Sequence, residues 1–142
     1  MAQNENVAAI ERAVEHMNEG NVDGYLELYA DDLTVHGYPP GVEGKAGVSE
    51  FYRAFRRALP DLQLTVEDVL AEGDKVAGRY RMRGTHSDEL MGVPASGREV
   101  DLEGQSFFRF QDGRVVERWQ SLDGVELMTQ IGALPASAEA EA

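Results

Sequence analysis

The sequence contains no cysteine, few prolines and no long run of hydrophobic residues. Without cysteine there can be no disulfide bond, no thiolate nucleophile and no zinc site with sulfur ligands. The hydrophobic runs are too short to cross a membrane, and the acidic, amphipathic N-terminal segment does not resemble a secretory signal. These absences fit a reducing compartment, so we expect a cytoplasmic protein that does not bind membranes.

Positive charge is also scarce, because 13 lysine and arginine residues face 26 aspartate and glutamate residues, and the net charge is −13. Nucleic acids and anionic membranes bind to basic surfaces, so we expect neither as a partner. A local group of arginines, at Arg53, Arg56 and Arg57, has the spacing of a solvated helix face. The length of 142 residues suits one domain with its own hydrophobic core.

Hydrophobic periodicity predicts helices first and strands later in the chain. Apolar residues three or four positions apart indicate helices, and apolar residues two positions apart indicate strands. The strands are separated by short turns such as Asp112-Gly113, so we expect them to pair mainly as hairpins. The expected helices cover residues 4–19, 22–30, 48–59 and 125–131. The expected strands cover residues 33–36, 62–71, 76–86, 98–110 and 114–122.

Helices followed by hairpin-connected strands are typical of an α+β fold. We expect a cone-shaped α+β barrel, in which N-terminal helices pack inside a curved antiparallel sheet and a short helix ends the domain. A cone of this kind leaves a cleft between helices and sheet, where small molecules commonly bind. The domain is expected to cover residues 1–135. The tail at 136–142 contains only Ala, Glu and Ser, and we expect it to be disordered.

Three segments resemble the SnoaL-like polyketide cyclases, which share the nuclear-transport-factor-2-like fold with the ketosteroid isomerases. The first is Val35-His36-Gly37, before a Pro-Gly loop. The second is Gly84-Thr85-His86, before the loop at 90–97. The third runs from Trp119 to Asp123 and continues into the apolar segment ending at Gly132. The resemblance covers residues 5–134.

The resemblance implies an enzyme that needs no cofactor and no metal. In the characterised cyclases an aspartate on the last strand is the acid/base for an intramolecular aldol ring closure, and Asp123 occupies that position. A histidine and amide groups on neighbouring strands hold the enolate. The substrate would be a hydrophobic, carbonyl-rich small molecule. The fold also commonly forms sheet-to-sheet dimers, and we expect a two-fold homodimer.

Two further readings of the same fold remain open at this point. The cavity could support isomerisation, dehydration, epoxide hydrolysis or cofactor-free oxygenation. An epoxide hydrolase would need Asp101 and Arg109 to point inward beside Asp123. Alternatively, the domain could bind a ligand or partner without any chemistry.

Asp123 is the first candidate for the catalytic acid/base. It lies four positions after Trp119, and side chains an even number of positions apart on a strand point to the same face. Both therefore face the cavity if Trp119 does. Burial of a carboxylate in an apolar cavity raises its pKa and makes it a competent base near neutral pH. The alternative role of Asp123 is to cap the short helix at 125–131.

Two histidines, His86 and His36, are the other catalytic candidates. His86 follows the inward-facing residues of its strand and could donate a hydrogen bond to a carbonyl oxygen, or it could hold the loop at 92–97. His36 could face the pocket from the first strand. These two histidines and Asp123 lie on separate strands without short ligand spacing, so no metal site is expected.

The remaining candidates are residues expected to bind substrate. Trp119 could form a pocket wall that stacks on a flat ligand, and Gln105 could hold the enolate from the strand beside it. The other expected lining residues are Tyr25, Tyr29, Phe51, Phe55, Tyr80, Met82, Met91 and Phe108.

Overall fold

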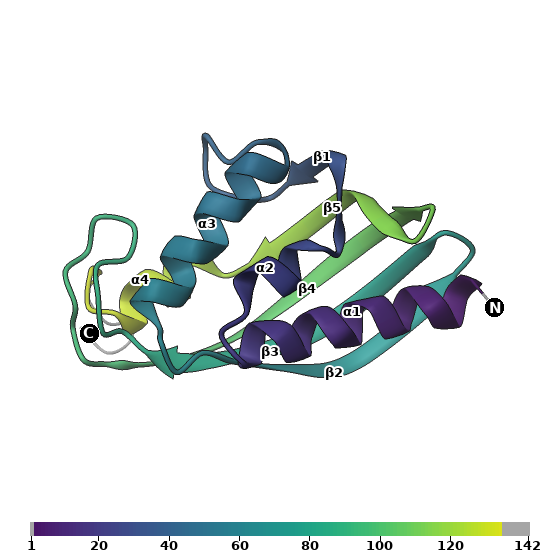
Figure 1. Cartoon of the computed structure of the whole chain (residues 1–142). Coiled ribbons are helices and arrows are strands. Elements are labelled where there is room, and N and C mark those ends of the chain that lie inside the picture. Colours follow the sequence, from purple (N-terminus) through teal and green to yellow (C-terminus); the bar gives the residue numbers. More distant parts are fainter. Residues whose placement is uncertain (1, 135–142) are drawn as a thin grey trace.

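The computed structural model describes residues 2–134 and has a mixed α+β architecture (Figure 1). It confirms the predicted fold class, including the short C-terminal helix. The expected tail at 136–142 lies outside the described residues. The helices are α1 (Ala2–Asn18), α2 (Val22–Leu26), α3 (Gly44–Ala58) and α4 (Gly124–Gln130). The strands are β1 (Tyr29–His36), β2 (Gln63–Glu72), β3 (Lys75–Thr85), β4 (Glu99–Gln111) and β5 (Arg114–Leu122).

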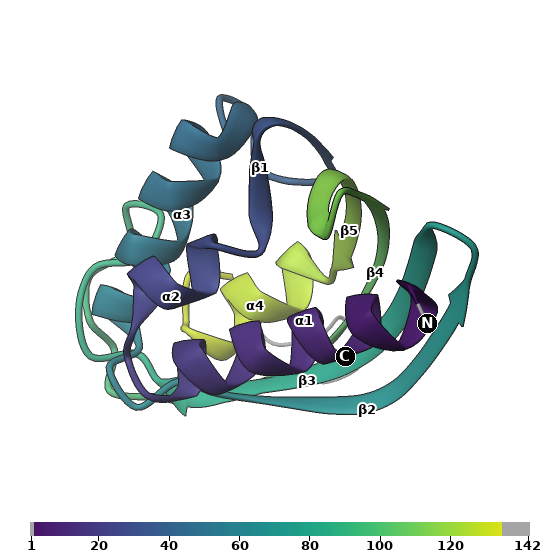
Figure 2. The same ribbon diagram turned by 45° about the vertical axis from the view of Figure 1, so that its right-hand side comes forward.

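The five strands form one curved sheet in the order β1-β5-β4-β3-β2. The neighbours from β5 to β2 pair antiparallel, whereas β1 runs parallel to β5. Helix α1 packs against β2 and α3 packs against β1, so the helices cover the concave face of the sheet (Figures 1 and 2). The curvature leaves an interior space between the sheet and the helices.

One boundary between helix and strand differs from the sequence prediction. Helix α2 ends at Leu26, and β1 begins at Tyr29, in a stretch that was expected to be helical. The backbone N–H of Val115 donates to the carbonyl of Leu28 at 2.8 Å, so pairing with β5 replaces helical bonding there. Tertiary pairing therefore overrides local helix propensity. As a result Tyr29 is fully buried at the start of a strand.

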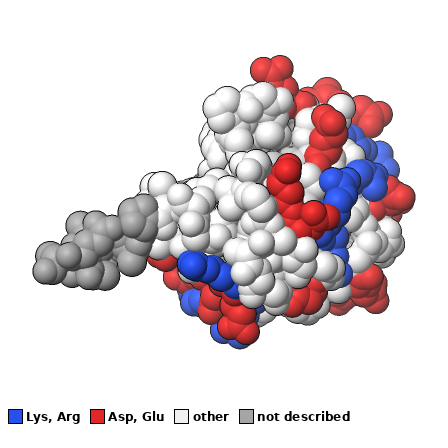
Figure 3. Space-filling model, turned by 90° about the vertical axis from the view of Figure 1, so that its left-hand side faces the viewer, with Lys and Arg blue, Asp and Glu red and all other residues white. Residues whose placement is uncertain are grey.

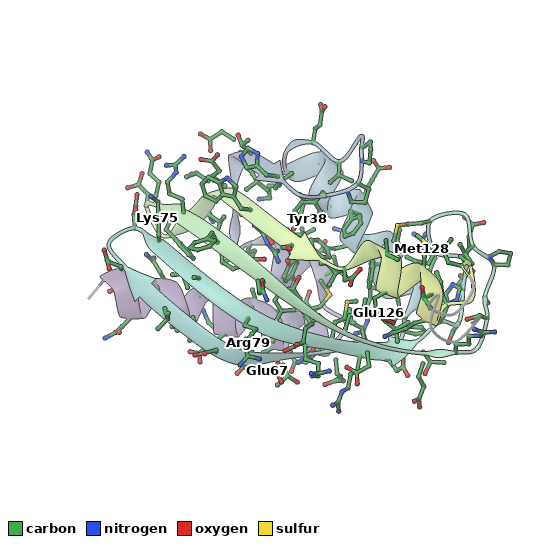
Figure 4. All side chains as sticks on the ribbon, turned by 180° about the vertical axis from the view of Figure 1, so that it is seen from behind. Tyr38, Glu67, Lys75, Arg79, Glu126 and Met128 are labelled. Carbon is green, nitrogen blue, oxygen red and sulfur yellow. The ribbon has the colours of Figure 1, made fainter. Side chains whose placement is uncertain are left out.

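The strands turn alternate side chains toward the helices. On β3 the inward residues include Tyr80 and Met82, as the sequence predicts, while Arg79 and Arg81 point outward. Glu67 and Arg79 lie together on the outer face of the sheet, 3.1 Å apart (Figure 4). Basic and acidic side chains also lie side by side on the face shown in Figure 3. On the outer sheet face Arg79, Arg81, Arg83 and Arg109 each pair with a carboxylate.

Strand β5 presents the opposite face from the one expected. Arg118, Gln120 and Leu122 point into the interior, and Arg118 is only 5% exposed. Trp119 points outward and is 36% exposed. The inward register is continued on β4, where Phe108 is the partner of Arg118 and Ser106 is the partner of Gln120. This parity decides which side chains form the functional site.

Candidate functional site

The interior space is an apolar cavity between the helices and the concave face of the sheet. Its volume is about 860 Å³, counting the part that opens to solvent. Helices α1 and α3 contribute one wall, and the inward residues of β2, β3 and β5 contribute the other. Six of the expected lining residues line it, namely Tyr25, Phe51, Phe55, Tyr80, Met82 and Phe108. Such a cavity suits a hydrophobic small molecule.

The polar end of the cavity is organised by Arg118. Its Nη1 donates to the hydroxyls of Tyr25 at 3.0 Å, Tyr29 at 2.5 Å and Tyr52 at 3.1 Å. Its Nη2 donates to Ser106 Oγ at 3.0 Å and to Gln120 Oε1 at 2.6 Å. Two more tyrosines join this network, because Tyr38 bonds to Tyr52 and Tyr80 bonds to Gln120 (Tyr38 is labelled in Figure 4). We call this set the Arg118 cluster: Arg118, Tyr25, Tyr29, Tyr38, Tyr52, Tyr80, Ser106 and Gln120.

The positive charge of Arg118 has no partner of opposite charge in residues 2–134, because all its hydrogen-bond acceptors are neutral. None of the salt bridges found there includes it. Burial opposes the charged form, but the surrounding tyrosine oxygens outweigh burial and keep the pKa of Arg118 above its ordinary value. The Phe108 ring lies beneath the guanidinium, 4.7 Å from its centre. The cluster is therefore a buried, permanent cation.

Four tyrosines of the cluster, Tyr25, Tyr38, Tyr52 and Tyr80, remain protonated at neutral pH. Burial raises the pKa of Tyr25 and Tyr38 well above the ordinary value, and it also raises the pKa of Tyr52. Burial raises the pKa of Tyr80 to about 12. The neighbouring Arg118 lowers each of these pKa values, but by less than burial raises them. Each of these four hydroxyls thus keeps a proton that can be donated.

Not all of these donors are used inside the protein. Tyr25, Tyr29, Tyr38 and Tyr52 carry four hydroxyl protons, and contacts among them use at most three: Tyr25 with Tyr29, Tyr38 with Tyr52, and Tyr25 with Tyr52. At least one of these protons is therefore not used in contacts among the four tyrosines. Gln120 lines the cavity, and its Oε1 accepts from three donors, which orients its amide; its Nε2 has no hydrogen-bond partner among the described residues. The polar end of the cavity thus offers donors to an oxygen-bearing ligand.

Asp123 lies outside this cavity. Its carboxylate is exposed, and Oδ1 accepts a hydrogen bond from the backbone N–H of Glu126 at 3.0 Å. It is therefore the N-cap of α4, the alternative role considered from the sequence. The expectation that it faces inward with Trp119 is corrected, because the inward positions on β5 have the other parity.

His86 is completely buried at the base of the loop that precedes β4. Its Nδ1 accepts from the backbone N–H of Ser96 at 3.2 Å and lies 2.8 Å from the Ser96 hydroxyl. Its Nε2 has no hydrogen-bond partner in the described chain. His86 is not among the cavity-lining residues, and its contacts are those of a residue that holds the loop.

His36 lies on the outer face of the sheet rather than in the pocket. Its Nε2 is 2.7 Å from Glu117 Oε2, and its ring stacks on Trp119 with centroids 5.3 Å apart. Trp119 therefore packs against a histidine outside and does not wall the cavity. The structure does not bring Asp123, His86 and His36 together.

Three other expected residues also lie away from the cavity or contact it differently. Gln105 is exposed on the outer face of β4, because its neighbours Gly104 and Ser106 take the inward positions. Met91 is 44% exposed in the loop before β4. Tyr29 is buried and reaches the site through its bond to Arg118.

Sequence reasoning missed Arg118, Tyr38 and Gln120. The sequence of β5 did contain a pattern that predicts the correct inward face. Val116 and Leu122 are apolar and lie an even number of positions from Arg118, so all three point to the same side of the strand. The large apolar indole of Trp119 instead favoured the interpretation that the odd-numbered side chains of β5 face the cavity, which is wrong. Tyr38 gave no signal, since it lies in an irregular loop.

Residues 2–134 also lack two features that would point to other functions. No group of three or more histidine, aspartate or glutamate side chains is placed to hold a metal ion there. In the same range no helix is long and apolar enough to cross a membrane.

Comparison with known proteins gives a consistent family. The sequence profile of the SnoaL-like polyketide cyclases matches residues 7–131. No protein with curated function matches the chain significantly in sequence. Among solved structures, AclR from Streptomyces galilaeus, named as a candidate hydroxylase, is 31% identical, with 94% of this chain and 99% of that chain covered and a TM-score of 0.83.

Two further structures are named as polyketide cyclase candidates. The SnoaL-like protein from Jannaschia sp. CCS1 is 28% identical, with 94% of this chain and 95% of that chain covered and a TM-score of 0.82. IdmH from Streptomyces antibioticus is 34% identical, with 89% of this chain and 98% of that chain covered and a TM-score of 0.75. Cyclase and hydroxylase names thus occur on one fold.

Proposed function

Because the chain belongs to the SnoaL-like polyketide cyclase family, we propose that it closes a ring in a hydrophobic, carbonyl-rich small molecule by a cofactor-free aldol reaction. One observation carries this proposal: an apolar cavity ends in a set of hydrogen-bond donors around a buried cation. The apolar walls would hold the carbon skeleton. The Arg118 cluster would receive one of its carbonyl oxygens.

The reaction needs stabilisation of negative charge on oxygen, which the donors of this cluster can give. In an aldol closure a carbon beside a carbonyl loses a proton, and its electron pair forms a bond to a second carbonyl carbon. The second carbonyl becomes a hydroxyl, so the product is an isomer of the substrate. Negative charge develops on oxygen in this process, and pre-oriented donors in an apolar site stabilise it strongly.

We predict that Tyr52→Phe lowers the turnover of a suitable diketone about a hundredfold, the usual loss when one oxyanion donor is removed. The test substrate is an aryl diketone whose carbonyl groups are separated by three methylene groups, which closes a six-membered ring. Product is measured by chromatography with mass detection. Ser121→Ala is the matched control, because it removes a hydroxyl from an exposed position on β5. Equal turnover in Tyr52→Phe and Ser121→Ala would contradict the proposal.

The acid/base role that the resemblance gives to Asp123 stays a prediction, and so does the stabilisation of the enolate by His86 or His36. Asp123→Asn separates its two roles, since asparagine keeps an oxygen that can cap α4 but cannot accept a proton at neutral pH. We expect native stability in this variant. Loss of turnover would then assign the base to Asp123, and full turnover would place proton transfer elsewhere.

Hydroxylation is a second reaction to consider, because AclR carries that name at 31% identity. The same diketone experiment separates the two reactions, since ring closure leaves the mass unchanged and hydroxylation adds an oxygen atom. Epoxide hydrolysis by an inward Asp-Arg-Asp group has less support. Asp101 pairs with Arg81 and Arg109 pairs with Glu117 on the outer face.

The outer face of the sheet supports the homodimer as a further proposal. Leu70, Ala77, Phe107 and Trp119 are cross-strand neighbours and form one row across β2, β3, β4 and β5, which we call the outer apolar row. Leu70 is 73% exposed and Phe107 is 57% exposed. Charged pairs such as Arg79 with Glu67 flank the row. A second copy related by a two-fold axis would cover this row with its own.

We predict that Phe107→Glu weakens the dimer about a hundredfold, because it places a charge in the centre of the contact. Sedimentation at several protein concentrations would measure the dissociation constant. Val125→Glu is the control, since Val125 is also an exposed apolar residue but lies on α4, away from the row. A monomeric wild type, or dimers of equal strength in both variants, would refute this interface.

A further inference from the structure

The starting observation is the unbalanced charge of Arg118. It is 5% exposed, and every acceptor around it is a neutral hydroxyl or amide oxygen. The cavity lining contains no aspartate or glutamate among the described residues. A buried cation is unfavourable unless an opposite charge accompanies it. The missing counter-charge must therefore be sought outside the side chains of the cluster.

We propose that the cavity takes its ligand as an anion: a hydrophobic small molecule with a delocalised two-oxygen acid group, a carboxylate or an ionised dicarbonyl, whose charge is balanced by Arg118. This inference rests on the proposed function in placing the substrate in the same cavity. It adds the charge state of that substrate.

Tyr25, Tyr38 and Tyr52 do not supply the counter-charge themselves. Tyr25, Tyr38 and Tyr52 have raised pKa values, because burial disfavours their phenolate forms more than Arg118 favours them. They remain neutral donors at physiological pH. An anion arriving from outside meets the opposite situation, since its charge is present before binding.

The cluster also has the donors that an anion with two oxygens needs. At least one tyrosine hydroxyl proton and the Gln120 Nε2 amide are not used within the cluster. In each tyrosine bonded to Arg118, the hydroxyl oxygen accepts a hydrogen bond from the guanidinium. The hydroxyl protons are thereby directed away from Arg118. An anionic ligand would complete a chain of guanidinium, hydroxyl and ligand oxygen.

The charge state has a consequence for ring closure. The lining contains no histidine or carboxylate among the described residues, so it offers no evident base. An ionised dicarbonyl carries part of its negative charge on the carbon between its carbonyls, and that carbon can attack a ketone carbon directly. The new carbon–carbon bond converts the ketone to an alkoxide, which takes one proton from water. The hydroxide so formed removes the remaining acidic hydrogen from the carbon between the carbonyls, so the water is restored and the product is again an ionised dicarbonyl. Arg118 would balance one negative charge throughout.

The test compares charged ligands with neutral ligands of the same shape, by calorimetric titration at neutral pH. Naphthoate is paired with naphthyl methyl ketone. Acetylindanedione, an acidic triketone that is ionised at neutral pH, is paired with its methyl-blocked form, which cannot ionise. We expect at least one anion to bind wild type about tenfold or more tightly than its neutral partner, as is typical of a charged hydrogen bond.

The preference is expected to vanish in Arg118→Met and to persist in Arg118→Lys, which keeps the charge. Arg109→Met is the matched control: it removes one positive charge from the outer face and should leave the preference intact. Circular dichroism checks that each variant is folded. If Arg118→Met fails to fold, Arg118→Gln takes its place. If neither variant folds, the comparison of charged and neutral ligands in wild type decides the question.

The outcomes separate this inference from the proposed function. A preference for naphthoate identifies a carboxylate, a preference for acetylindanedione identifies an ionised dicarbonyl, and either supports the inference even if no diketone is turned over. Equal affinity for charged and neutral partners in wild type would overturn it, even if ring closure is observed. An anion preference that survives in Arg118→Met and Arg118→Gln would overturn it as well.

Discussion

Substitution of Gly37 by alanine is expected to destabilise the protein by about 4 kcal/mol, combining left-handed backbone strain with a steric clash. Gly37 follows β1 and has φ 84°, a conformation that L-residues with a side chain rarely adopt. A Cβ atom there would lie 1.9 Å from the backbone carbonyl oxygen of Gln120. Neither the clash nor the strain can be relieved by a rotamer change, so the end of β1 would have to separate from β5.

Gly41→Ala is the control that isolates the clash. Gly41 has φ 93°, but a Cβ atom there would have no neighbour within 4 Å. In Gly41→Ala the free energy of unfolding should therefore fall only by the cost of the left-handed backbone conformation, about 1 to 2 kcal/mol. Urea unfolding of both variants measures the difference. Equal destabilisation of the two would show that the approach of Gly37 to Gln120 is not as close as the structure has it.

The same contact connects stability to the site. Gln120 lines the cavity and accepts from Arg118 at 2.6 Å. A displacement of its backbone would move this amide relative to the guanidinium. Partly folded Gly37→Ala protein should for this reason lose the anion preference as well, whereas Gly41→Ala should keep it.

The fold could be predicted from the sequence because its signals are local. Alternating apolar residues mark β3 and β4. Asp112-Gly113 marks the connection from β4 to β5, a tight hairpin in which both residues have positive φ. Strand β1 was harder to predict, because its pairing partner β5 lies about eighty positions later in the chain. Its parallel pairing extended the strand back to Tyr29.

The site could be predicted only in part, for a physical reason. Six aromatic and apolar lining residues follow from helix and strand periodicity, since burial alone explains their positions. Arg118 contradicts periodicity, because a charged residue is normally assigned to the solvent side. Its burial depends on tyrosines contributed by α2, β1 and α3, which no local pattern connects. Conversely Trp119 is exposed in the described chain, although an indole is the strongest local signal for an interior position.

The position of Asp123 shows the same limit. The sequence allows both a cavity carboxylate and an N-cap, because both roles need a carboxylate just after the last strand. The structure shows the cap, with the carboxylate exposed. The choice depends on the parity of β5, and a shift of one residue reverses every side chain on a strand.

Alkaline pH is expected to unfold the protein through the Arg118 cluster. Burial raises the native pKa of Tyr25, Tyr38, Tyr52 and Tyr80 above the value of 10.0 that an exposed tyrosine has. Below pH 10 both folded and unfolded chains keep these protons, so stability is unaffected. Above it the unfolded chain releases protons that the native state retains, so stability falls as pH rises.

The expected size of the effect can be stated for Tyr80, whose native pKa is about 12. Each unit of pKa difference corresponds to about 1.4 kcal/mol, so Tyr80 alone should remove roughly 2 to 3 kcal/mol once the pH exceeds its native pKa. The other three tyrosines add to this loss. Tyr80→Phe should therefore show a smaller fall in stability between pH 10 and pH 12 than wild type, whatever its stability at neutral pH.

Two signals measured on one sample test this mechanism. Phenolate absorbance in the near ultraviolet follows tyrosine ionisation, and circular dichroism follows the fold. We expect the two transitions to coincide, because these four tyrosines ionise when the cavity opens. A native circular dichroism spectrum with these tyrosines already ionised near the ordinary pKa of 10.0 would contradict a buried cluster. Coincident transitions would instead show that the donors of the Arg118 cluster are also what limits the protein at high pH.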